Sequence, residues 1–151
     1  MLSRTKPDDF TMLYPKYETN IHCEIPSKSV DKTGNFMVMC NMSQVVSKDY
    51  YKLSPYHAYC YGDQALIRIT NTLADNDKTI LLVHDSFADV VIPFLAMGIQ
   101  NTHAIDLRHF TGSLKKYISK NVPDMIIVMY NTGGIGGAID WDTHKSTYDF
   151  R

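Results

Sequence analysis

The sequence predicts an α/β fold in which a parallel sheet lies between layers of helices, preceded by an irregular, β-containing part. A continuous run of β-branched residues and Leu predicts a buried parallel strand at 79–84, and two further strands are expected at 102–107 and 125–130. Helical segments are expected between these runs, and this alternation is that of a βαβαβ unit with right-handed crossovers. A chain of 151 residues is long enough for one domain with a substantial core.

The first part, residues 1–62, has a weak pattern and is rich in Tyr, Met, Ser and Lys. Three short runs in it have a β-like composition: 10–14, 21–25 and 36–42. Gly34-Asn35 gives a turn signal between the last two runs. We therefore expect small antiparallel strands or extended loops that belong to the same domain as the rest.

The second part, residues 63–131, is expected to form the βαβαβ core. Its first predicted element is a helix over 64–73, which Asp63 can cap and in which four apolar residues follow helical spacing. These four are Leu66, Ile67, Ile69 and Leu73. Two more predicted helices, 88–97 and 113–120, alternate with the strands.

The third part, residues 132–151, begins with the glycine-rich run Gly133-Gly134-Ile135-Gly136-Gly137. Such a run predicts a flexible hinge or linker. The tail after it carries Trp141, Tyr148 and Phe150, but its apolar residues follow no regular period.

Composition and charge exclude several classes of function. Lys and Arg number 15 and Asp and Glu 16, so a net charge of −1 offers no basic surface for nucleic acid or anionic lipid. The apolar runs are far shorter than the roughly 20 residues of a membrane helix, and the first residues lack the apolar run of a signal peptide. The cysteines, Cys23, Cys40 and Cys60, lack zinc-ligand spacing. Three buried thiols are the simpler expectation, and one disulfide with a free thiol is the alternative.

Polar residues follow each predicted parallel strand. His84-Asp85-Ser86 follows the first, Asp106-Leu107-Arg108-His109 the second and Tyr130-Asn131 the third. Ligands of open parallel sheets bind beyond these carboxyl ends. A serine between a strand and a helix lies near free backbone N–H groups that favour an oxyanion, and Asn131 can add a side-chain N–H.

The same residues also have ordinary structural explanations. Ser86 or Asp85 can be the N-cap of the next helix, and Asn131 can be a turn residue. Arg108 can form an ion pair with Asp106 or Asp85. A metal site is a further alternative, although no tight ligand spacing demands it, and we expect neither a metal nor a cofactor. Its ligands would be His84, Asp85, Asp106 and His109.

The stretch Ile80-Leu81-Leu82-Val83-His84-Asp85-Ser86-Phe87-Ala88 resembles the strand and nucleophile turn of SGNH hydrolases, whose first block is usually Gly-Asp-Ser. The run 51–131 is similar to the C-terminal part of the DHHW family of Gram-positive bacteria, relatives of the alginate O-acetyltransferase group. The matching pieces are Asp85-Ser86-Phe87-Ala88, Pro93-Phe94-Leu95, Asp106-Leu107-Arg108-His109-Phe110 and Pro123-Asp124 through Tyr130-Asn131. Pro7-Asp8-Asp9-Phe10 with Tyr14-Pro15 extends the match loosely.

The resemblance implies an SGNH-like esterase or O-acyltransferase that acts on a cell-surface carbohydrate or a small acyl ester, outside the cell or in its envelope. Ser86 would be the nucleophile, with its own N–H and Asn131 in the oxyanion hole. Asp85 would brace the turn, and Arg108 would pair with Asp85 or meet an anionic substrate.

Two departures from the family pattern leave the general base open. His84 stands where many SGNH enzymes have glycine, and the chain lacks the Asp-His-His-Trp motif that would supply the base and its orienting aspartate. A serine without a base is a poor nucleophile. The base can come from Asp142 and His144 in the tail, from His84, or from an upstream domain of the same parent protein.

Two other functions remain as alternatives. The chain can be a non-catalytic or incomplete SGNH-like domain that binds glycan or a partner protein at the same cleft. A flavodoxin-like nucleotide or phosphate binder has the same βαβαβ pattern, but the loop after 79–84 contains no glycine.

Overall fold

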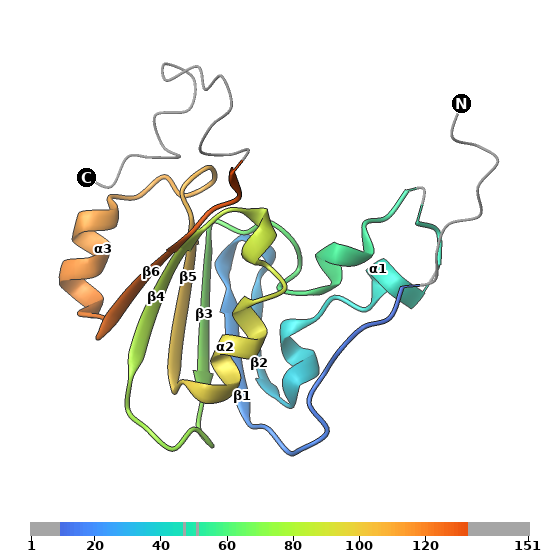
Figure 1. Cartoon of the computed structure of the whole chain (residues 1–151), viewed down its shortest axis with the longest axis horizontal. Coiled ribbons are helices and arrows are strands. Elements are labelled where there is room, and N and C mark those ends of the chain that lie inside the picture. Colours follow the sequence, from blue (N-terminus) through green and yellow to red (C-terminus); the bar gives the residue numbers. More distant parts are fainter. Residues whose placement is uncertain (1–9, 47, 51, 133–151) are drawn as a thin grey trace.

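The computed structural model describes residues 10–46, 48–50 and 52–132, and these form a six-stranded mixed sheet with helices packed against it (Figure 1). The strand order is β2-β1-β3-β5-β4-β6. The strands are β1 (Ile21–Ile25), β2 (Val30–Gly34), β3 (Leu66–Asn71), β4 (Thr79–His84), β5 (Asn101–Asp106) and β6 (Met125–Met129). The helices are α1 (Ser43–Val46), α2 (Ile92–Gly98) and α3 (Leu114–Asn121), with 3₁₀ turns η1 (Pro26–Lys28), η2 (Phe36–Met39), η3 (Pro55–Ala58) and η4 (Ser86–Ala88).

The parallel half of the sheet confirms the predicted α/β class. β4 lies between β5 and β6 and runs parallel to both, with Leu82 opposite Ala104 on one side and Ile127 on the other. The chain passes from β4 through α2 to β5 and from β5 through α3 to β6. These elements are the expected βαβαβ unit.

Helices cover the two faces of this half separately (Figure 1). Leu82 packs into the larger apolar core with Ile92 and Ala96 of α2. Its neighbour Leu81 points to the other face and packs into the smaller core with Leu114 of α3. The connections after β4 and β5 therefore leave toward opposite faces, which opens a crevice at the carboxyl ends of these two strands.

The antiparallel half corrects the prediction of a helix over 64–73. Leu66–Asn71 is β3, which pairs antiparallel with β1 and with β5. Burial alternates along β3, so that Ile67 and Ile69 point into the core and Arg68 does not. The spacing of the apolar residues fits the period of two of a strand as well as the period of a helix. Pairing with a strand on each side makes this segment a strand.

The structure also differs from the sequence patterns at three other segments. The run 21–25 is β1, as expected, but the run 36–42 forms the 3₁₀ turn η2 at its start, which Asn35 caps through Met37 N–H. Residues 10–14 form no helix or strand. The predicted helix 88–97 is divided into η4 and α2.

All three cysteines are buried and free, which confirms the expectation of three buried thiols. Within the described ranges, no helix has the length and apolar character needed to cross a membrane.

Candidate functional site

One carboxylate joins the ends of two strands beside Ser86. Asp85 Oδ1 caps η4 by accepting a hydrogen bond from Phe87 N–H (3.0 Å). Asp85 Oδ2 accepts from Asn131 N–H (2.8 Å) and from Asn131 Nδ2 (2.6 Å). Asp85 thereby fixes the turn after β4 to the residue that follows β6.

Ser86 is the first residue of η4 and is partly exposed. Within the described part of the chain, no hydrogen bond engages its hydroxyl. Because the α-helix begins only at Ile92, the hydroxyl does not lie at the N-terminus of α2. The helix dipole expected to support an oxyanion is therefore absent here, and backbone N–H groups of the short turn are the remaining donors.

Arg108 is held by two acidic residues beside this turn. Its Nε lies 3.0 Å from Asp106 Oδ1 and 3.1 Å from Oδ2, and its main-chain N–H also donates to Asp106 Oδ1 (2.9 Å). Arg108 Nη2 bonds Asp106 Oδ2 and lies 3.4 Å from Asp63 Oδ2. Asp106 is fully buried, so this pairing compensates its charge, and the hydrogen bond with Asp106 raises the pKa of Arg108.

Asp63 and Asp89 form a second acidic contact beneath the turn. Asp89 is fully buried, and neither of its oxygens has a hydrogen-bond donor among the described residues. Asp63 Oδ1 is buried without a donor as well. Burial, followed by the neighbouring Asp63 carboxyl group, raises the pKa of Asp89 to about 8 from an ordinary 3.8. Asp89 therefore keeps its proton in most folded molecules at neutral pH.

A strained loop delivers Asp63 to this position. Cys60, Tyr61 and Gly62 have φ values of 52°, 61° and 77°, so three successive residues adopt the left-handed conformation. A side chain at Gly62 would come within 2.9 Å of His57 Cγ, which adds a steric requirement for glycine there. Strain of this kind persists only where the surrounding structure imposes it.

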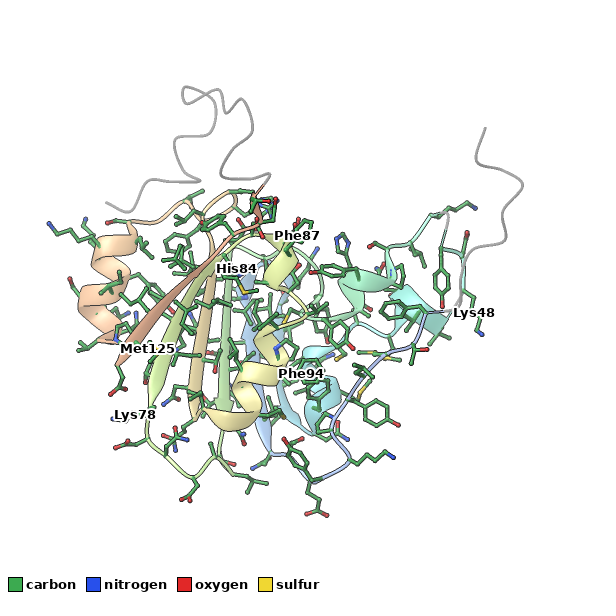
Figure 2. The ribbon with its side chains drawn as sticks, in the orientation of Figure 1. Lys48, Lys78, His84, Phe87, Phe94 and Met125 are labelled. Atoms are coloured by element: carbon green, nitrogen blue, oxygen red, sulfur yellow. The ribbon has the colours of Figure 1, made fainter. Side chains whose placement is uncertain are left out.

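His84 faces the protein interior. Its Nδ1 lies 2.8 Å from the Asp85 carbonyl oxygen, which can only accept, so Nδ1 carries the hydrogen. Its Nε2 is buried without a partner among the described residues, and Asp89 Oδ1 lies 3.8 Å from Nδ1. Burial lowers the pKa of His84, which favours the neutral ring. Figure 2 shows His84 and Phe87 at the same end of the sheet.

Tyr56 connects η3 to the serine turn. Its hydroxyl donates to the Phe87 carbonyl oxygen (2.7 Å). Burial, followed by the charge of Asp89, raises the pKa of Tyr56 to about 12, so the phenol stays a donor at neutral pH. Phe87 itself is 65 % exposed beside Ser86. The turn thus carries a partly exposed serine beside an exposed apolar ring, and the hydrogen bonds from Tyr56 and to Asp85 hold it in place.

The predicted site residues have different outcomes. The structure brings together Ser86, Asp85 and Asn131 through the hydrogen bonds above and places Arg108 with Asp106 nearby. Asp142 and His144 lie outside the described residues. His109 is half exposed, with Nε2 4.0 Å from Asp106 Oδ2. Across residues 10–46, 48–50 and 52–132, no three His, Cys, Asp or Glu side chains are arranged to hold a metal ion.

Sequence reasoning missed Asp63, Asp89 and Tyr56 as members of this cluster. In the sequence Asp63 has an ordinary explanation as a helix cap, and Asp89 lies within a predicted helix. The one available signal was an acidic side chain, Asp89, among apolar residues between a buried strand and Ile92.

A groove of about 770 Å³ lies at the opposite end of the sheet from Ser86. It is bordered by Asn20, just before β1, and by Leu73, just after β3, together with Tyr14 and Tyr17. None of the polar residues around Ser86 lines it. The groove therefore lies apart from the polar residues at the strand ends.

Comparisons with known proteins bear on the fold. No protein-family model matches the chain, and no curated protein matches it. A DHHW family protein from Eubacterium siraeum DSM 15702 is similar with a TM-score of 0.69 and 16 % identity, over 93 % of this chain and 44 % of that one.

Bacillus cereus PatB1 is also similar, in two structures. The structure with a sulfonyl adduct has a TM-score of 0.58 and 22 % identity, over 80 % of this chain and 40 % of that chain. The other has a TM-score of 0.56 and 24 % identity, over 80 % and 38 %. At these identities the likeness is one of fold, and it agrees with the expected relation to DHHW and SGNH-like proteins. The chain spans about two-fifths of the length of these structures.

Proposed function

We propose that this chain is the serine-bearing part of an SGNH-like esterase or O-acyltransferase acting on an acylated carbohydrate of the bacterial cell envelope, with Ser86 as nucleophile. The observation that carries the proposal is the Asp85 carboxylate, which accepts hydrogen bonds from Phe87 and from both the main chain and side chain of Asn131. This carboxylate holds the serine turn and the Asn131 amide in one arrangement. Preorganisation of this kind is what acyl transfer requires.

In the proposed reaction, Ser86 Oγ attacks the acyl carbonyl carbon while a histidine takes the hydroxyl proton. In this proposal the oxyanion is stabilised by Ser86 N–H and by the side-chain amide of Asn131. The C–O bond to the leaving alcohol breaks as the histidine returns the proton, and an acyl-serine remains. Water or a sugar hydroxyl then attacks the acyl-serine in the same way, which gives hydrolysis or transfer.

The source of the histidine is part of the proposal. Because His84 Nδ1 is occupied by the Asp85 carbonyl and the ring is buried, His84 is poorly placed to reach the hydroxyl of the partly exposed Ser86. We place the base at His144, oriented by Asp142. A histidine from polypeptide outside these 151 residues is the alternative.

Sulfonylation tests the nucleophile directly. PatB1 has been obtained with a sulfonyl adduct, so an aryl sulfonyl fluoride is a suitable reagent for this chain as well. We expect one sulfonyl group per chain, located by peptide mapping at Ser86 and lost in Ser86→Ala. Ser119→Ala is the matched control, since Ser119 is an exposed serine on α3. Equal labelling of wild type and Ser86→Ala would contradict the proposal.

Hydrolysis of p-nitrophenyl acetate tests the base. Turnover lost in both Ser86→Ala and His144→Ala would support a base in the tail. Loss in Ser86→Ala alone would place the base elsewhere. Asp85→Ala should slow labelling of Ser86 by roughly tenfold or more, because hydrogen bonds to a charged group contribute about 1.5–3 kcal/mol each.

A second function is favoured by one observation, the lack of an activating partner for the Ser86 hydroxyl among the described residues. An incomplete SGNH-like domain would bind glycan or a partner protein at the same strand ends without reacting. Absence of both labelling and turnover, with a folded chain, would favour this function.

A further inference from the structure

β6 is an outer strand whose exposed surface is apolar on both faces. It pairs with β4 on one side, and no described strand pairs with its other side. Met125, Ile126, Val128 and Met129 are 57 %, 45 %, 56 % and 36 % exposed. An apolar outer strand of this kind is a template for pairing with another chain, and proteins normally protect such edges with charges, bulges or coverage.

The antiparallel half of the sheet shows the residue pattern of strands that have one face in the core and the other in solvent. In β1 and β3, buried apolar residues alternate with polar ones. The polar residues are His22, Glu24, Arg68 and Thr70. β6 has no such alternation, since its sequence Met125-Ile126-Ile127-Val128-Met129 suits a strand in the interior of a sheet.

The apolar surface continues from the edge of β6 onto one face of the sheet. A groove of about 550 Å³ lies between β6 and α2, lined by Met125, Ile127, Ile80, Leu95 and Ile99. Lys78 and Asp124 close one end of it, joined by an ion pair of 3.0 Å. Figure 2 shows Lys78 and Met125 at this same side of the molecule.

The backbone of β6 defines which residues can pair outward. Met129 C=O accepts from Asp85 N–H (3.3 Å), so Met129 turns its backbone groups toward β4. Successive residues of a strand turn these groups to opposite sides, so Val128 and Ile126 turn theirs to the open side. Outward pairing is therefore available at these two residues.

We propose that β6 pairs antiparallel with β6 of a second copy of this chain, across a two-fold axis that passes beside Ile127. In this register Ile126 faces Val128 of the second copy, and Met125 faces Met129 of the second copy. The strand is thus complementary to itself, with apolar side chains opposite one another at every position. The nearest charge, Asp124, faces Tyr130 of the second copy, so no like charges meet.

A second copy is the occupant that β6 itself favours, because its sequence Met125-Ile126-Ile127-Val128-Met129 is nearly the same in either direction about Ile127. The interface is independent of the proposed acyl chemistry. It joins the two sheets into one and lets the α2 groove of each copy continue along the partner's β6.

Sedimentation velocity of the full chain, up to about 100 µM, tests the proposal, since association of micromolar affinity is nearly complete at that concentration. We expect a dimer. Ile126→Lys and Val128→Lys should each weaken dimerisation by about tenfold or more, because each places a charge in an apolar strand pair. Leu73→Lys, at a site 61 % exposed and far from β6, is the matched control and should still dimerise. Circular dichroism confirms that each variant is folded.

A double variant tests the register. Ile126→Lys combined with Val128→Glu places Lys opposite Glu twice across the axis, and we expect it to dimerise again. A monomeric wild type, or a dimer that both lysine variants leave intact, would overturn the proposal, and failure of the double variant to recover would overturn the register. A monomer that dimerises only after removal of residues 133–151 would show instead that the tail covers the edge.

Discussion

The Asp89→Asn variant should be more stable than the wild type at neutral and alkaline pH. Asp89 is fully buried beside Asp63, and its oxygens have no donor among the described residues. An asparagine has nearly the same shape, stays neutral, and can donate Nδ2–H to the buried Asp63 Oδ1. The variant therefore keeps the contact and removes the titration.

The magnitude follows from the pKa of Asp89. It is about 8 in the folded chain and 3.8 as an ordinary value, so the proton stays bound in the folded state while the unfolded state releases it. A raised folded-state pKa gives stability that is complete below pH 4 and is lost as the pH rises toward 8. Each pH unit changes the unfolding free energy by about 1.4 kcal/mol, which amounts to at most about 4 kcal/mol at pH 7.

Urea denaturation at pH 4.5, 6, 7 and 8 measures this difference. The free energies of unfolding of wild type and Asp89→Asn should diverge as the pH rises, with the melting temperature of the variant higher by roughly 10 °C at pH 7. Asp75→Asn, at an exposed position, is the matched control and should follow the wild type. Parallel curves for wild type and Asp89→Asn would refute the raised pKa of Asp89.

Two further substitutions test the scaffold of the site. Gly62→Ala should lower the free energy of unfolding by about 1–3 kcal/mol, because φ is 77° and the new methyl group would lie 2.9 Å from His57 Cγ. Gly98→Ala, with no atom within 4 Å of the new methyl group, is its control in the same urea titration. Arg108→Gln should cost about 3–5 kcal/mol, because it leaves the fully buried Asp106 carboxylate without a counter-charge. A cost below 1 kcal/mol in thermal unfolding would contradict that account.

Local signals in the sequence were sufficient for much of the fold. The three predicted strands correspond to β4, β5 and β6, and the predicted helix 113–120 corresponds to α3, which Ser113 caps. β3 was mistaken for a helix because the spacing of its apolar residues fits both periods. Two β-branched isoleucines, Ile67 and Ile69, with Thr70 beside them, were the evidence for a strand.

The site was only partly predictable for a different reason. Adjacent residues such as Asp85 and Ser86 share one turn, and a strand end can be recognised from sequence. The contact between Asp63 and Asp89 depends on the left-handed loop at Cys60–Gly62, which brings a distant part of the chain under the serine turn. Such a contact has no local signature, since it exists only once β3 and β4 share a sheet.

The buried thiols make the chain its own probe of conformational opening. Cys23, Cys40 and Cys60 are its only cysteines, and burial raises the pKa of each, to about 12 for the first two. An alkylating reagent can therefore react only during excursions that expose them. Cys60 adjoins the acidic pair, whereas Cys23 lies within β1. Their separate labelling rates would distinguish local release of the serine-site loop from global unfolding, without any introduced label.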